Sequence, residues 1–236
     1  MKLTILETGE VPHEVIGTYG TYAEMFRRMF ADAGAGFDLD VVSIHAGAEF
    51  PDPAGLERVL IPGSSSGVYD SHAWLDPLRA FIRSAYRTGL PMAGICFGHQ
   101  IIADALGGDV GKSEKGWGLG RHSYRVLDRP GFMSGVADVV QVTCSHQDQV
   151  KVPPAAAQTI LASDFTPHAG LYYDGGHVLS FQPHPEIEDE YARYLIERRR
   201  DRISGEVHSL ALASLARASD RLVMARVIAD FFQDQH

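Results

Sequence analysis

The stretch Gly94-Ile95-Cys96-Phe97-Gly98-His99-Gln100 is the most informative part of this sequence. It joins a short apolar, strand-like run at residues 91–95 to a helix-like run at residues 97–106. Glycines placed two residues before and two residues after a cysteine are typical of a sharp strand-to-helix turn, because glycine relieves crowding there. We therefore predict that Cys96 stands on such a turn, in a strained backbone conformation, at the carboxyl end of a sheet.

Strand-like and helix-like runs alternate on the amino-terminal side of this turn. Short apolar runs predict strands at residues 3–7, 38–45 and 58–61, and helical spacing predicts helices at residues 22–33 and 75–88. Such alternation favours an α/β fold, in which helices cover both faces of a central, mostly parallel sheet.

The character of the chain changes between about residues 111 and 178. Short β-like runs at residues 123–127, 139–144 and 177–181 are separated by turns and show little helical periodicity. We expect them to form a small antiparallel excursion from the central sheet. No internal repeat or low-complexity linker interrupts the sequence, so we expect a single domain over residues 1–236.

The chain after Pro185 has the periodicity of helices, at residues 189–203 and about 221–232, and from about residue 187 we expect a C-terminal helical extension. These helices could form an interface with a partner chain. Apolar residues at helical spacing more often cover a sheet, and we expect that role here.

The composition is that of an ordinary water-soluble globular protein. The 236 residues are 45% hydrophobic and 22% charged, with a net charge of -9. The basic residues gather only at Arg198, Arg199, Arg200 and Arg202, among several acidic residues, which favours a solvated helix face with ion pairs. No basic patch predicts nucleic-acid binding.

Targeting and metal-binding signals are not evident in the sequence. The chain opens directly on a strand-like run, it contains no apolar run of membrane-spanning length, and it has only two cysteines, so we expect no membrane association and a location in the reducing cytoplasm. The histidines show no paired ligand spacing. We therefore expect no metal site and no cofactor.

Cys96 and Cys144 differ in their surroundings. The turn predicted around Cys96 places its sulfur at a helix N-terminus, whose partial positive charge favours the nucleophilic thiolate. Cys144 ends an alternating, strand-like run, which predicts an ordinary buried side chain.

The segment Gln182-Pro183-His184-Pro185-Glu186 supplies a candidate base for a nucleophilic cysteine. Each proline disfavours helix at the residue before it, so the segment is expected to be extended. Residues two apart in an extended chain share a side, which allows His184 and Glu186 to form a hydrogen bond. The carboxylate would then fix the tautomer of the imidazole, as the third member of a catalytic triad does.

Together these two motifs resemble the catalytic signature of the class I glutamine amidotransferases. The resemblance covers nearly the whole chain and is strongest to the free-standing, GMP-synthase-like members. It implies a flavodoxin-like three-layer α/β/α fold and a triad of Cys96, His184 and Glu186. It also implies that backbone N–H groups at Gly63, Ser64 and Phe97 form an oxyanion hole.

The same resemblance implies which residues bind the substrate. Gln100 and the segment Ser145-His146-Gln147-Asp148 match the positions that hold glutamine in this family. Two departures stand out, because many relatives have glycine at the position of Gln147 and a Gly-Gly-Pro loop in place of Pro62-Gly63-Ser64. Gly116-Trp117-Gly118 could border the pocket, and Trp117 could equally be a core residue.

The activity implied is attack of Cys96 on the side-chain amide of glutamine, which releases glutamate and ammonia for an unknown acceptor. No synthetase domain is recognisable in the sequence, so a separate synthetase chain is a possible partner. One alternative is a γ-glutamyl peptidase or hydrolase that uses the same triad on another small γ-glutamyl compound. A non-catalytic regulatory relative is a third, and the intact triad motif argues against it.

Overall fold

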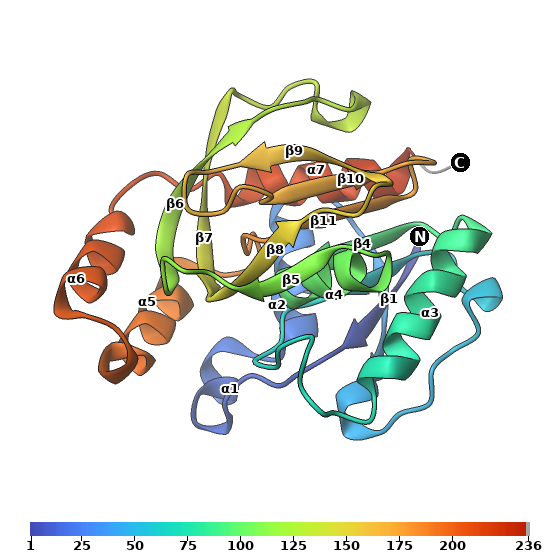
Figure 1. Ribbon diagram of the computed structural model, residues 1–236, viewed down its shortest axis with the longest axis horizontal. Coiled ribbons are helices and arrows are strands. Elements are labelled where there is room, and N and C mark those ends of the chain that lie inside the picture. Colours follow the sequence, from blue (N-terminus) through green and yellow to red (C-terminus); the bar gives the residue numbers. More distant parts are fainter. Residues whose placement is uncertain (235–236) are drawn as a thin grey trace.

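The computed structural model describes residues 1–234, which form one nine-stranded sheet, a separate two-stranded sheet and seven α-helices (Figure 1). The strands are β1 (Lys2–Glu7), β2 (Asp38–Ser43), β3 (Val59–Ile61), β4 (Met92–Ile95), β5 (Asp109–Lys112), β6 (Gly118–Val126), β7 (Val139–His146), β8 (Asp148–Val152), β9 (Ala157–Ala162), β10 (Gly170–Tyr173) and β11 (Val178–Phe181). The helices are α1 (His13–Tyr19), α2 (Tyr22–Asp32), α3 (Leu75–Thr88), α4 (Phe97–Ala105), α5 (Asp189–Arg198), α6 (Gly205–Ser214) and α7 (Arg221–Gln233).

The large sheet has a parallel part and an antiparallel part. The strands follow the order β2-β1-β3-β4-β11-β10-β9-β6-β7, and the first five are parallel to one another. The remaining pairings are antiparallel, and they extend the same sheet. The predicted α/β fold, with a mostly parallel central sheet and an antiparallel excursion, is confirmed. The strand predicted at residues 177–181 was expected in the excursion, but as β11 it pairs in parallel with β4.

Helices cover both faces of the parallel strands. Leu3 and Ile5 of β1 point into a core with α2 and α7, whereas Leu6 points into the core on the opposite face, with α3 and α4. This alternation follows from the two-residue period of a strand, and both sets of side chains are buried because both faces are covered. The result is the three-layer arrangement that the sequence predicts.

Local sequence signals account for helix ends near the sheet. Thr21 begins α2 with a capping box, in which its hydroxyl accepts a hydrogen bond from the Glu24 N–H and the Glu24 carboxylate accepts one from the Thr21 N–H. Gly89 ends α3 in the left-handed conformation, with φ of 73°, which glycine adopts without a steric penalty.

Several short elements were not predicted from the sequence. They are α1, both strands of the two-stranded sheet (β5 and β8), and β9 and β10 of the antiparallel part. Two predicted bounds also differ, because β2 ends at Ser43 and a 3₁₀ turn follows it, and β6 begins at Gly118, five residues before the predicted start at residue 123. Strands of four to six residues that are partly exposed carry too few apolar positions to show a clear period.

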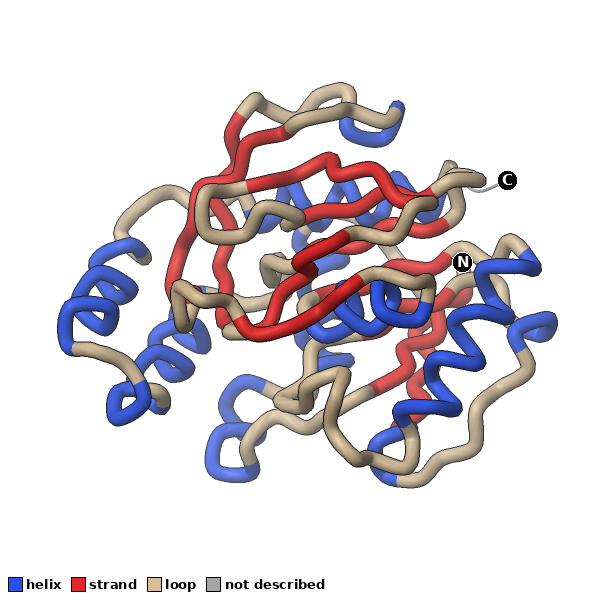
Figure 2. The backbone as a smooth tube through the Cα atoms, viewed as in Figure 1, coloured by secondary structure: helices blue, strands red, loops and turns tan. Residues whose placement is uncertain are grey.

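The C-terminal extension forms three α-helices and covers two regions. Helix α5 ends at Arg198 and a 3₁₀ turn (Arg200–Arg202) follows it, so the helix predicted over residues 189–203 is shorter, and α6 is additional. Helix α7 packs Phe231 and Phe232 into the core below the sheet, so the expected covering role is confirmed for it. Helices α5 and α6 lie together at one end of the molecule, at the left in Figure 2.

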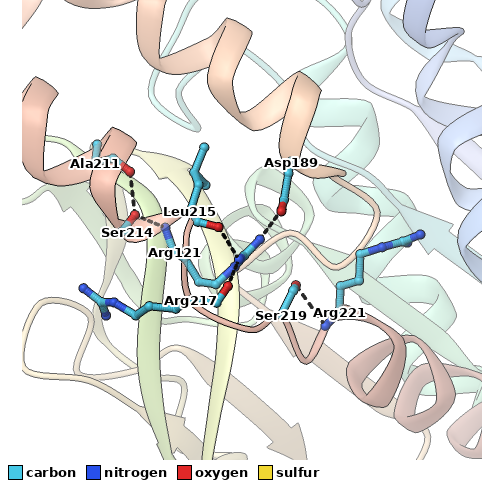
Figure 3. Close-up of polar contacts among 8 residues, drawn as sticks. All are labelled: Arg121, Asp189, Ala211, Ser214, Leu215, Arg217, Ser219 and Arg221. Carbon is cyan, nitrogen blue, oxygen red and sulfur yellow. Dashed lines mark hydrogen bonds and ion pairs between the residues drawn. The ribbon is translucent and has the colours of Figure 1, made fainter.

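Arg121 of β6 holds this end of the molecule together (Figure 3). Its side chain is 1% exposed, pairs with Asp189 at the start of α5, and donates to the carbonyl oxygens of Leu215, at 2.9 Å, and Arg217 beyond α6. The backbone N–H of Arg121 donates to the hydroxyl of Ser214 at 2.8 Å. One buried cation thus joins β6, α5 and the chain that leaves α6.

Among residues 1–234, no helix is both long enough and apolar enough to cross a lipid bilayer.

Candidate active site

Cys96 stands at the junction of β4 and α4 in a strained conformation. Its backbone has φ of 53° and ψ of −101°, and within residues 1–234 it is the only non-glycine residue with positive φ. The flanking glycines are needed by close approach: a Cβ on Gly98 would lie 2.0 Å from the carbonyl oxygen of Ile61, and one on Gly94 would lie 2.6 Å from the carbonyl carbon of Gly98. The predicted sharp turn with a strained cysteine is confirmed.

His184 and Glu186 lie on the segment that leaves β11. His184 Nδ1 lies 2.6 Å from Glu186 Oε1, and both side chains are buried. The backbone N–H of His184 donates to the carbonyl oxygen of Thr143 at 2.8 Å, which ties this segment to β7. The hydrogen bond predicted from the proline-braced sequence is therefore present.

The two motifs meet because their strands are neighbours. Strand β4 pairs with β11 in parallel, with Ile95 opposite Phe181, and the N–H of Cys96 donates to the carbonyl oxygen of Phe181 at 2.8 Å. Both chains therefore leave the sheet at the same carboxyl edge, where ligands bind in open α/β folds.

The charge state of His184 follows from these neighbours. Burial alone would lower the pKa of its imidazole, but the negative charges of Cys96 and Glu186, and hydrogen bonds to them, outweigh burial and raise the pKa to about 10. The second carboxylate oxygen of Glu186, Oε2, is buried and accepts no hydrogen bond from the residues that the structure describes. The arrangement stabilises an imidazolium beside the sulfur at neutral pH.

The loop at Gly63 closes one side of this group. A Cβ on Gly63 would lie 3.1 Å from Cε1 of His184 and 3.8 Å from Cβ of Cys96. The Ser64 hydroxyl donates to the carbonyl oxygen of Thr8 at 2.7 Å, and the Thr8 hydroxyl lies 3.2 Å from the carbonyl oxygen of Gly63. The loop is thus pinned to the end of β1 with its backbone against the imidazole and the cysteine.

Gln100 and residues 145–148 form the opposite side. The Gln100 amide donates to the carbonyl oxygen of Asp148 at 2.8 Å, and His146 Nδ1 lies 3.0 Å from the same oxygen. Burial lowers the pKa of His146 to about 3, so its ring is neutral. Gln147 has no positive φ, so the glycine found in many relatives is not required for the backbone conformation here.

A cavity of about 640 Å³ brings most of the predicted site residues together. It is lined by Gly63, Ser64, Cys96, Gln100, Ser145, His146, Gln147, Asp148 and His184. The side chains of Phe97 and Glu186 do not line it: Phe97 packs into the core with α3, and Glu186 lies behind His184. Only the backbone N–H of Phe97 is therefore a candidate donor to a bound ligand.

Sequence reasoning missed part of this cavity. Tyr22, Tyr69 and Tyr191 line it, and the Tyr69 hydroxyl donates to Asp148 Oδ2 at 2.8 Å. Trp117 also lines it and packs against a hydrophobic cluster that includes Tyr191, so it is at once a pocket residue and a partner of the core. One sequence signal could have found Tyr191. It belongs to the buried, regularly spaced residues of α5, a helix that begins five residues after the predicted base, His184.

The expected solvated face of Arg198, Arg199, Arg200 and Arg202 is wrong in part. Arg198, Arg199 and Arg202 line the cavity, and Arg200 does not. Arg199 is half-buried, with its guanidinium carbon 4.7 Å from the ring centre of Trp117. The chain turns α5 toward the β5–β6 connection, a tertiary arrangement that the charge pattern of one helix does not reveal.

Fold and site together define a class of α/β proteins in which a cysteine on a strand-to-helix turn faces a histidine held by a carboxylate. The sequence matches the family described as "Glutamine amidotransferase class-I" over residues 14–198, and the chain belongs to this family.

Named relatives fall into two groups. Gamma-glutamyl peptidase 2 of Arabidopsis thaliana is 31% identical, over 76% of this chain and 73% of that protein. The glutamine-hydrolysing GMP synthase of Aeropyrum pernix is 30% identical, over 78% of this chain but only 34% of that longer protein.

A solved glutamine amidotransferase from Thermotoga maritima shares the fold, with a TM-score of 0.75 at 20% identity, over 99% of this chain and 97% of that one.

Proposed function

We propose that this protein hydrolyses a γ-glutamyl amide bond through a thioester on Cys96, with His184 as acid and base and Glu186 as its orienting partner. The observation that carries the proposal is the position of strained Cys96 beside a buried imidazole, which a carboxylate holds at 2.6 Å. Membership of the class I glutamine amidotransferase family supports an amide-hydrolysing enzyme. A regulatory protein without activity has no need of this combination.

The first half of the reaction forms the thioester. The Cys96 thiolate adds to the carbonyl carbon of the γ-glutamyl group, and the carbonyl oxygen becomes an oxyanion. The C–N bond then breaks while the His184 imidazolium gives its proton to the departing nitrogen. For glutamine the products of this half are ammonia and the γ-glutamyl thioester.

The second half releases glutamate. His184, now neutral, accepts a proton from water as the oxygen of that water adds to the thioester carbon. Collapse of the second tetrahedral intermediate breaks the C–S bond and restores the thiolate beside the imidazolium. Glu186 holds one ring nitrogen throughout, so that the other nitrogen faces the reacting atoms.

Backbone N–H groups stabilise the oxyanion in this proposal. The N–H of Phe97 belongs to the first turn of α4, whose N–H groups have no partner within the helix. The N–H groups of Gly63 and Ser64 belong to the pinned loop opposite. Donors fixed before the reaction typically contribute a factor of about 10² to 10³ each in rate.

Gln100 and residues Ser145, His146, Gln147 and Asp148 hold the α-amino and α-carboxylate groups of the substrate in this proposal. The position of these residues supports the assignment, since all of them line the cavity that contains Cys96. The Gln100 side chain and the Asp148 backbone are already joined by a hydrogen bond of 2.8 Å, so this wall is formed before the substrate binds.

Two fates are open for the nitrogen. As a glutamine amidotransferase or glutaminase, the protein would release ammonia or deliver it to a separate synthetase chain. The GMP synthases support such a partner, because this chain matches only about a third of their length. The second candidate is a γ-glutamyl peptidase. It is favoured by the cavity of about 640 Å³, which extends from Cys96 as far as Arg202 and has room for a leaving group larger than ammonia.

Residues 1–236 are proposed to form a single catalytic domain, with a helical extension from about residue 187. A cytoplasmic location is proposed because Cys96 and Cys144 are both free thiols, which a reducing compartment preserves.

The test is a measurement of ammonia and glutamate released from glutamine and from a panel of γ-glutamyl compounds. Wild-type protein should release glutamate, Cys96→Ser should not, and a diazo-ketone analogue of glutamine should block the activity and add its mass to Cys96. Cys144→Ser is the matched control and should keep the activity, because Cys144 is buried in β7 away from the cavity lining. Wild-type-like hydrolysis by Cys96→Ser would overturn the proposal.

A further inference from the structure

One face of α5 forms a cavity wall that runs away from His184. Tyr191, Leu195 and Arg198 line the cavity at spacings of four and three residues, so they lie on one side of α5. At 1.5 Å per residue this part of the wall is roughly 10 Å long, and Arg202 of the 3₁₀ turn that follows also lines the cavity. It begins next to the proposed base and ends in arginines.

Arg199 is a cation without a carboxylate partner. Its Nη1 donates to the carbonyl oxygen of Leu195 at 3.1 Å and its guanidinium carbon lies 4.7 Å from the ring centre of Trp117. Within residues 1–234 no acidic group lies within 4.0 Å of it. A half-buried charge of this kind is costly unless a ligand pairs with it.

Arg199 shares its cavity with the reacting group. Both Arg199 and Cys96 line this cavity, so the arginine and the cysteine face the same space. A ligand held by Cys96 could reach Arg199 with its other end.

The remaining charges on the cavity walls leave this end positive. Arg198 is 4.0 Å from Glu14, and Arg202 forms no ion pair in the described part of the chain. Lys112 is a further cation of the lining, and each acidic residue of the lining contacts another group of the protein. Glu10 contacts His45 at 3.2 Å, Asp70 accepts from the N–H of Gly67 at 2.8 Å, and Asp148 accepts from Tyr69 at 2.8 Å.

With the α-carboxylate of the substrate held by Gln100 and residues 145–148, as proposed above, this wall has no task in the hydrolysis of glutamine itself. The leaving group of glutamine is ammonia, a single nitrogen that needs no arginine and no extended wall. A guanidinium presents a planar fork of N–H donors that fits a carboxylate, and stacking on an indole ring restricts its orientation. The arrangement suits a longer leaving group that ends in a negative charge.

We infer that the substrate is a γ-glutamyl amino acid or short γ-glutamyl peptide, and that Arg199, assisted by Arg202, binds the free carboxylate of its leaving group. The inference rests on the proposed function and extends it. Hydrolysis breaks the γ-glutamyl C–N bond, the oxygen of water goes to glutamate, and the leaving amino acid or peptide departs as the amine with its carboxylate on the arginines.

The experiment compares matched substrates that differ only in this carboxylate. One pair is γ-glutamylglycine and γ-glutamylglycinamide, and a longer pair is γ-glutamylglycylglycine and its C-terminal amide. Release of glutamate gives kcat/KM for each compound. In at least one pair the wild type should prefer the acid by about tenfold or more, the ratio expected for one hydrogen-bonded ion pair.

The variants Arg199→Gln and Arg202→Gln should lower this preference, and Arg199→Gln should bring it close to one. Arg199→Lys keeps the charge and should keep part of the preference. Arg200→Gln is the matched control, because Arg200 belongs to the same basic cluster but does not line the cavity. The preference is a ratio of two kcat/KM values measured on one preparation, so a variant that folds only in part still yields it. Arg202 is exposed, so its substitution should not impair folding and provides a second variant.

The outcomes separate the two proposals. An equal kcat/KM for acid and amide in both pairs overturns the role of the arginines while γ-glutamyl hydrolysis stands. A preference for the acid that survives in both Arg199→Gln and Arg202→Gln does the same. Unaltered kinetics together with lost binding of a synthetase chain would assign the arginines to a protein interface instead. Absence of glutamate release from every compound, glutamine included, would remove the proposed function and this inference with it.

Discussion

Gly63 and His184 are so close that a methyl group at position 63 would lie 3.1 Å from Cε1 of the imidazole. This is tighter than an ordinary contact, so the ring or the loop must move by a few tenths of an ångström. Gly63→Ala should therefore reduce kcat/KM for γ-glutamyl hydrolysis, by less than the roughly 100-fold that a misplacement of about 1 Å can cost. Steady-state kinetics measures this, and thermal unfolding should show little change.

Gly17→Ala is the control for that substitution. Gly17 lies on exposed α1, and nothing lies within 4 Å of a Cβ placed there. It should leave the kinetics unaltered and, by its better helix propensity, stabilise the protein by up to about 1 kcal/mol. Full activity in Gly63→Ala would show that the loop does not approach the imidazole as described.

Glu186 should control the pH at which His184 loses its proton. The raised pKa, about 10, means that the imidazolium persists well above the ordinary value of 6.5, and that it deprotonates only as the pH rises through about 10. Glu186→Gln removes one of the negative charges responsible, so the titration should move to lower pH. NMR of the imidazole nitrogens checks this directly, and hydrolysis should fall on the order of 10⁴-fold because the ring loses its orienting partner. Coincident titration curves would contradict the coupling.

Arg121 should matter for stability far more than an ordinary arginine on the same strand. Arg121→Met leaves the carbonyl oxygens of Leu215 and Arg217 without their buried donor and breaks the pair with Asp189, at an expected cost of about 3 kcal/mol. Arg125→Met on β6 removes a side chain that is 57% exposed and should change stability by less than about 0.5 kcal/mol. Denaturant unfolding measures both values, and equal values would refute the anchoring role.

The sequence was sufficient for the parts of the site whose geometry is set locally. Glycines at 94 and 98 dictate the turn at Cys96, and two prolines extend the chain so that His184 and Glu186 share a side. The strand before Cys96 was predictable as well, because strands buried on both faces are continuously apolar. Residues 177–181 were expected in the antiparallel excursion, and their parallel pairing with β4 was not predicted.

The cavity wall that contains Arg198, Arg199 and Arg202 could not be predicted in the same way. Arg199 is half-buried because α5 turns its end toward Trp117, a residue from a connection far earlier in the chain. Charge patterns within one helix describe neighbours three and four residues away, and they carry no information on such a contact. The short strands β5 and β8 escaped prediction for a related reason: each depends on pairing with the other more than on its own sequence.

The pairing of β4 with β11 has a consequence for how such enzymes could diverge. Residues 96–177 separate the two strands in sequence, and of these residues 109–173 form the antiparallel addition and the two-stranded sheet. The distance between β4 and β11 is nevertheless set by backbone hydrogen bonds, at about 4.8 Å. Evolution could therefore lengthen or shorten the loops of this region without moving Cys96 relative to His184, as long as β7 keeps the contact between Thr143 and His184. Chemistry and substrate preference would then be inherited as separable modules, and segment exchange between relatives is a practical route to new γ-glutamyl specificities.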